Sequence, residues 1–147
     1  MRLLLVCDGP GDVDGLKALT YRILCEKYDW LDGVPVEWVE YEPGRPFLDL
    51  HHAEVAYASI VRKQLPKESS GFGGLRARLA FLVGKALARD EPLGIVFVWD
   101  VDHQPNRITA VQDARKRTPG IDVAVGMALP EYEAWCICAF AAETDEE

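Results

Sequence analysis

The sequence lacks any apolar run long enough to cross a membrane. In 147 residues, no apolar stretch approaches the roughly 20 residues that a transmembrane helix needs. The apolar start of the chain meets Asp8 after five residues and has no small-residue cleavage site behind it, so it predicts a strand rather than a signal peptide. We therefore expect a cytoplasmic protein with no membrane partner.

Cysteine is scarce, and none of it is arranged in CxxC pairs. An intracellular protein of this size does not need disulfides, so buried thiols are the expected state. The four cysteines are Cys7, Cys25, Cys136 and Cys138.

Basic residues are outnumbered, and the net charge is −8. A strongly acidic protein does not attract nucleic acid through its overall field. The charge is uneven, however, because residues 62–117 carry +5 and the rest of the chain carries −13. This pattern fits an anionic ligand bound on one face with metal ions over nearby carboxylates, and it equally fits ordinary solvated helix faces.

The residues that are present indicate one α/β domain over residues 1–147, because 49% of them are hydrophobic and apolar strand patterns alternate with helical ones. We expect an open, mainly parallel four-stranded sheet with helices on both faces and an acidic tail at 143–147 that frays. The predicted strands are 2–7, 34–41, 94–99 and 121–129. The predicted helices are 14–28, 53–65, 75–90, 107–117 and one from Pro130, with a loop at 69–74.

Acidic residues follow three of the predicted strands. Asp8 ends the first strand, Asp100 and Asp102 end the third, and Glu131 and Glu133 follow the fourth. The carboxyl ends of parallel strands share one edge of a sheet, where open α/β sheets bind ligands. Acids that are distant in sequence should therefore converge there, although Asp is common in any strand-end loop because it caps helices and makes turns.

Clustered carboxylates repel one another unless a cation or a proton lies between them. Mg²⁺ or Mn²⁺ is the natural occupant, since hard divalent cations prefer oxygen ligands. If the third strand persisted through Asp100-Val101-Asp102, alternation would direct both carboxylates to one ion. Such an ion holds a phosphate and stabilises charge that builds up during transfer.

Three motifs resemble those of Toprim domains. Val6-Cys7-Asp8-Gly9 resembles their first motif, Phe97-Val98-Trp99-Asp100-Val101-Asp102 resembles their Asp-x-Asp motif, and Pro130-Glu131-Tyr132-Glu133-Ala134-Trp135 resembles a Glu-Ala-Trp signature of small stand-alone bacterial relatives. Many members of that group occur in genome-defence contexts. The similarity spans residues 2–140, and about twenty positions carry it. The Asp-x-Asp motif alone is a weak signal, whereas the three motifs in this order are moderately specific.

The resemblance implies a Toprim/Rossmann-like fold and roles for individual residues. Asp100 and Asp102 match the Mg²⁺ ligands, and Asp8 matches a Glu that acts as general acid/base or metal ligand. Glu133 matches the signature acid as a further catalytic candidate, with Asp12 and Glu131 as possible support. Asp8 is one methylene shorter than Glu, and a displacement of about 1 Å can cost roughly 100-fold in rate.

Other interpretations have to be weighed against this one. The stretch after Asp8 is close to a dinucleotide fingerprint, but its third Gly is out of register. A phosphoacceptor receiver domain would need a Lys where Pro130-Glu131 stands. The pair His51-His52 is a metal candidate or a surface pair, and His103 is a proton-transfer candidate or a plain loop residue. The four tryptophans, at 30, 38, 99 and 135, suit base stacking or core packing.

Two functions of different classes follow. The first is a Mg²⁺-dependent nuclease or related phosphoryl-transfer domain, whose nucleic-acid backbone contacts come from Arg107, Arg115, Lys116 and Arg117. The second is a catalytically weak or inactive Toprim-fold binding module that works with a partner such as an ATPase in a defence complex. Asp8, which stands where the Toprim motif has Glu, and the acidic net charge favour the second function.

Overall fold

The structure is a computed structural model and describes residues 1–10, 13–66, 71–102 and 104–128. Strands and helices alternate along most of this length. Their bounds in chain order are β1 (Arg2–Cys7), α1 (Val13–Lys27), η2 (Asp29–Leu31), β2 (Glu37–Trp38), β3 (Leu48–Asp49), η3 (Leu50–His52), α2 (Ala53–Ile60), α3 (Gly71–Leu87), β4 (Gly94–Asp100), α4 (Asn106–Lys116) and β5 (Asp122–Ala128).

All strand pairs of the sheet are parallel, which confirms the predicted α/β class. The strand order is β2-β1-β4-β5, and β3 also pairs with β1. The pairing of β4 with β5 runs along the whole of both strands, from Gly94 opposite Asp122 to Asp100 opposite Ala128. All carboxyl ends therefore lie at one edge of the sheet, as the prediction of convergence requires.

The second predicted strand, 34–41, is shorter than expected. Only Glu37–Trp38 pairs with the start of β1, while a separate two-residue strand, Leu48–Asp49, pairs with its end. Between the two pieces the chain turns back on itself through a bridge from Glu42 to Arg45, with Gly44 at a φ of +75°. Prolines at 43 and 46 flank this turn and cannot donate ladder hydrogen bonds, so the strand breaks there.

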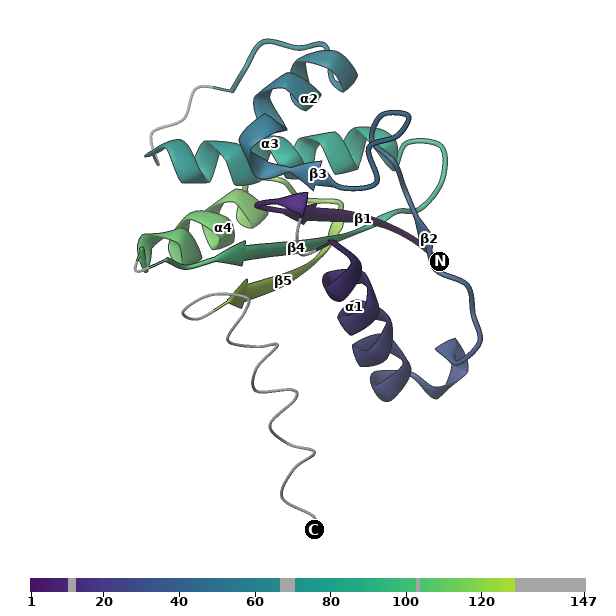
Figure 1. Cartoon of the computed structure of the whole chain (residues 1–147). Helices are drawn as coiled ribbons and strands as arrows, with labels where there is room; N and C mark the ends of the chain where they lie inside the picture. The colour runs from purple at the N-terminus through teal and green to yellow at the C-terminus, as the bar shows by residue number, and fades with distance from the viewer. Residues whose placement is uncertain (11–12, 67–70, 103, 129–147) are drawn as a thin grey trace.

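Helices cover both faces of the sheet (Figure 1). On one face, Leu4 and Val6 of β1 join a core with side chains of α2, α3 and α4. On the other face, Leu3 and Leu5 of β1 pack with Val13 and Leu16 of α1. We refer to these two sides as the α3 face and the α1 face.

The loop predicted at 69–74 is wrong for residues 71–74, because α3 begins at Gly71. Packing against β4 explains the difference. A Cβ on Gly73 would lie 3.0 Å from the Trp99 ring, so the glycines of this turn permit a close approach that outweighs their poor helix propensity.

The remaining boundaries agree closely with expectation, apart from α2, which ends at Ile60 rather than at 65. The helix predicted from Pro130 and the tail at 143–147 lie outside the described residues. No helix in the part of the chain that the structure describes is both long and apolar enough to span a membrane.

Candidate functional site at the carboxyl edge of the sheet

The carboxyl edge brings together acids that follow three strands. Asp8 comes directly after β1, whose last residue, Cys7, lies opposite Asp49 of β3. On the other side of β1, Val6 lies opposite Phe97, and β4 then continues to Asp100. Asp8 therefore occupies the middle of this edge, between Asp49 and the end of β4.

Each carboxylate oxygen of Asp8 has one ring nitrogen beside it. The Trp99 indole Nε1 donates to Oδ2 at 3.1 Å. The His51 Nε2 lies 3.2 Å from Oδ1. The Asp8 side chain retains 25% exposure, so its remaining lone pairs stay accessible from solvent.

The partner of the second ring nitrogen of His51 identifies the tautomer of the imidazole. Arg76 Nη1 lies 3.1 Å from His51 Nδ1. A guanidinium can only donate, so Nδ1 accepts and the imidazole proton sits on Nε2, facing Asp8. The three side chains form a chain of close contacts, in which Arg76 orients His51 and His51 Nε2 lies beside the Asp8 carboxylate.

Asp49 explains why His51 reaches this position. Its Oδ1 accepts from the His51 backbone N at 2.8 Å, and its Oδ2 lies 2.9 Å from His52 Nδ1. This N-cap starts η3 directly at the end of β3, which presents His51 toward Asp8 and turns His52 onto Asp49 instead. The adjacent histidines thus have separate partners rather than one shared ion.

The Asp100-Val101-Asp102 segment does not continue as a strand. β4 ends at Asp100, and Asp102 adopts a φ of +44°. The alternation argument for two parallel carboxylates therefore does not extend across the pair. Asp100 shares the register of Val98, which packs on the α1 face, whereas Asp8 binds Trp99, which belongs to the core of the α3 face.

Arg107 ties the start of α4 to the end of β4. One of its nitrogens, Nη1, donates to the Asp102 carboxylate at 2.7 Å and to the Asp100 backbone oxygen at 2.6 Å. Its guanidinium carbon lies 4.8 Å from the centroid of the Trp99 ring. Trp99 thus connects the two halves of the site, with Asp8 at its ring nitrogen and Arg107 over its face.

The other predicted backbone contacts lie elsewhere. Arg115 and Lys116 are exposed in the last turn of α4, and Arg117 pairs with Asp113 at 2.9 Å. Nine residues of helix separate Lys116 from Arg107, which is about 13 Å along the axis and leads away from the carboxyl edge. The structure therefore places only Arg107 of the four beside the acids.

A hollow of about 450 Å³ adjoins the site between α3 and α4. Its polar lining contains two guanidinium groups, several neutral polar groups and one carboxylate, that of Asp113, which pairs with Arg117. The other polar lining residues are Arg76, Gln104, Asn106, Arg107 and Thr109, and Trp99 also lines the hollow. Such a set of donors suits an anionic group such as a phosphate, because arginine forks match its oxygens.

A protein metal site needs several ligand side chains close to one point. Within the described ranges, no group of three or more His, Cys, Asp or Glu side chains is close enough to hold an ion. Asp12, His103, Glu131 and Glu133 lie outside those ranges, together with Cys136 and Cys138. Of the described cysteines, Cys7 is buried and Cys25 is partly buried, and both are reduced thiols.

Reasoning from sequence missed Asp49 and the part of the Trp99 indole as a donor to Asp8, while Arg76 was expected only as one of the basic residues between 76 and 117 that contact a nucleic-acid backbone. The signal for Asp49 was present, because an Asp directly after an apolar strand residue and two residues before a His is a capping pattern. Comparison with protein-family models, with curated proteins and with solved structures finds no match to this chain, so the functional argument depends on the geometry above.

Proposed function

We propose that this chain is a Toprim-like, Mg²⁺-dependent phosphoryl-transfer domain that cleaves nucleic acid, in a genome-defence setting. The observation that carries the proposal is the meeting of Asp8, Asp49 and the end of β4 at one sheet edge, next to a hollow lined by Arg76 and Arg107. Carboxylates beside guanidinium groups are the combination that phosphodiester chemistry needs, one set for a cation and the other for phosphate oxygens.

Carboxylates are the ligands that a hard divalent ion prefers, but the described acids alone form no group of three around one point. Asp8 accepts a hydrogen bond on Oδ2 and is 25% exposed, which leaves lone pairs for a further contact. In the proposal, Asp100 and Asp102 hold the ion, and Asp8 completes its shell or transfers a proton. Glu133 supports them, with Asp12 and Glu131 in weaker roles. When bound, the ion would neutralise charge that builds on the phosphate.

The chain's own residues then have distinct tasks. Arg76 and Arg107 bind the phosphate oxygens in the hollow, and Asn106 and Thr109 add neutral contacts. His51, held by Arg76 and by the cap at Asp49, keeps the Asp8 carboxylate oriented toward the edge.

A cleavage assay tests the proposal. Purified protein is incubated with labelled single- and double-stranded DNA and RNA in Mg²⁺ or Mn²⁺, and wild type is compared with Asp8→Asn and Asp100→Asn. We expect each variant to lose more than the roughly 10- to 100-fold that removal of an outer-shell partner costs. Asp90→Asn, an exposed acid beyond the end of α3, is the matched control and should retain full activity.

Circular dichroism and thermal unfolding establish that each variant is folded. Cleavage by Asp8→Asn and Asp100→Asn at the wild-type rate would contradict the proposal. Metal-dependent cleavage that Asp100→Asn alone abolishes would retain the ion site and remove the role of Asp8.

One observation favours the second function, a binding module without turnover. The acids already have partners within the protein, since Asp8 accepts from the Trp99 indole and lies beside His51, and Asp102 pairs with the Arg107 guanidinium. A site whose acids are paired with protein groups can bind an anion in the hollow without catalysing a reaction. Catalysis would then belong to a partner such as an ATPase. The same assay separates the two functions: this one predicts no cleavage by the pure chain, but DNA or RNA binding that Arg76→Ala weakens.

A further inference from the structure

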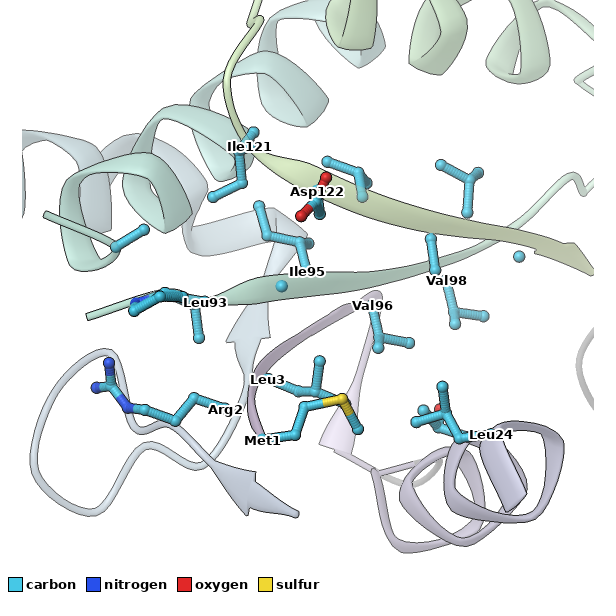
Figure 2. Close-up of a pocket in the computed structure, with 18 of the residues that line it drawn as sticks. Met1, Arg2, Leu3, Leu24, Leu93, Ile95, Val96, Val98, Ile121 and Asp122 are labelled. Atoms are coloured by element: carbon cyan, nitrogen blue, oxygen red, sulfur yellow. The ribbon is translucent and has the colours of Figure 1, made fainter. Parts of the chain in front are cut away.

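The hollow between α3 and α4 differs in its lining from a larger one on the side of α1. The larger one, of about 1040 Å³, is lined mainly by aliphatic side chains such as those of Leu3, Val96 and Ile121 (Figure 2). Aliphatic groups give an anion no hydrogen bonds. The hollow between α3 and α4 has one guanidinium group from each helix, from Arg76 and Arg107, so an anionic ligand belongs there.

Arg107 is held in a fixed orientation at this hollow. Its Nη1 donates to the Asp102 carboxylate at 2.7 Å and to the Asp100 backbone oxygen at 2.6 Å. Its guanidinium carbon lies 4.8 Å from the centroid of the Trp99 ring. The Arg107 side chain is only 17% exposed, so these contacts fix both the plane and the direction of the guanidinium.

The edge of this guanidinium formed by Nε and Nη2 has no acceptor among the described residues. A guanidinium is planar and carries five N–H groups, of which Nη1 supplies two. The rest belong to Nε and Nη2, whereas the hydrogen bonds of the Arg107 side chain to described residues both start from Nη1. Nε and Nη2 together form a fork that matches two oxygens of one phosphate. Because Arg107 lines the hollow, an anion there meets a donor pair whose direction is already fixed.

Asp102 opposes an anion at this edge. Its carboxylate lies 2.7 Å from Nη1, so its negative charge offsets the positive charge of the guanidinium and repels an anion on the far side. The Asp102 side chain is 41% exposed, and solvent therefore reduces this repulsion without removing it. The guanidinium in turn competes with any cation for the same carboxylate. A cation on Asp102 and an anion on Arg107 each remove what opposes the other, and such reciprocal coupling is positive cooperativity.

We propose that Arg107 binds a phosphate in the hollow through Nε and Nη2, and that Asp102 restrains this binding until a divalent cation offsets its charge. The inference rests on the phosphate and cation sites of the proposed function, and it does not depend on cleavage. The carboxylate that lines the hollow itself, Asp113, has a counter-ion of its own, since it pairs with Arg117 at 2.9 Å. Asp102 is therefore the acid that sets the affinity of Arg107 for phosphate.

Phosphate titrations in buffer that contains EDTA test the restraint without any metal. The full-length chain is titrated with inorganic phosphate, and phosphorus NMR measures the affinity. Asp102→Asn keeps an oxygen that accepts from Nη1 but removes the charge, so we expect it to bind phosphate about threefold to fivefold more tightly than wild type, the effect of one partly exposed ion pair. In the Arg107→Gln background the same change should give no increase. An unchanged affinity of Asp102→Asn, or an equal increase in both backgrounds, would overturn the proposal.

Binding of Mn²⁺ alone tests the competition, and the electron paramagnetic resonance signal of the free ion measures it. Arg107→Gln removes the competing guanidinium and should bind Mn²⁺ about threefold to fivefold more tightly than wild type. Arg115→Gln, at the exposed end of the same helix, is the matched control and should keep the wild-type affinity. Equal Mn²⁺ affinities of Arg107→Gln and wild type would overturn the proposal. The proposed function fails separately, when the wild-type chain cleaves neither DNA nor RNA, and neither titration depends on that result.

Discussion

Replacing Gly84 with Ala should destabilise the fold, although alanine is the better helix former. A Cβ at this position of α3 would lie 2.8 Å from Ile95 Cγ1 and 3.6 Å from Leu4 Cδ2, and still closer to the Ile95 Cδ1 methyl. Ile95 is 1% exposed and Leu4 is fully buried, so neither side chain has free space into which to move. Helix propensity contributes about 1 kcal/mol in favour of Ala, while overpacking of a filled core costs about 1–3 kcal/mol. We expect a net loss of up to about 2 kcal/mol.

A double-mutant cycle isolates the steric cause. Ile95→Val removes the methyl group nearest to the new Cβ and by itself costs about 0.5–1.5 kcal/mol. If the clash is real, Gly84→Ala combined with Ile95→Val should be less destabilised than the sum of the single variants by about 1 kcal/mol. Urea unfolding followed by circular dichroism measures all four proteins, with a common m-value as the check on two-state behaviour. Additivity within about 0.5 kcal/mol, or a stabilising Gly84→Ala, would refute the reasoning.

Two further predictions concern the ring at the centre of the site. Trp99→Phe removes the donor to Asp8 and should cost about 1–2 kcal/mol in urea unfolding, because hydrogen bonds to charged groups contribute about 1.5–3 kcal/mol and Asp8 is partly solvated; an unchanged midpoint would show that this bond does not contribute. Arg107→Lys keeps the charge but loses the planar group that lies over Trp99 and contacts Asp102, so the melting temperature should fall by about 3 °C for each kcal/mol lost, with an expected loss of about 1 kcal/mol. A variant that melts at the wild-type temperature would contradict the stacking argument.

The parts of the fold that depend on local pattern were predictable from sequence. The buried runs Arg2–Cys7 and Gly94–Asp100 were recognisable as strands because continuous apolar residues are typical of the interior of a parallel sheet. The alternation of strands and helices predicted that their carboxyl ends share one edge, whereas their placement as neighbours comes from the structure.

Long-range packing decided the parts that were predicted wrongly. The start of α3 at Gly71 depends on a fit against Trp99, 26 residues downstream of Gly73, which no local propensity reports. The contact of His51 with Asp8 joins residues 43 positions apart, and it exists because Asp49 caps η3 at that point. Contacts of this kind depend on strand register, and register is a property of the whole sheet.

The two margins of the sheet differ in a way that bears on self-association. The outer margin beyond β1 consists of two strands of two residues each, separated by a turn, with the exposed Glu37 on the first. A margin so short and interrupted offers a foreign strand almost no continuous backbone ladder to extend. On the opposite margin, β5 runs for seven residues and, among the described strands, pairs only with β4. We therefore expect a foreign strand to add to β5 rather than to the other margin. A single Lys substituted at an exposed position of β5 would hinder such pairing.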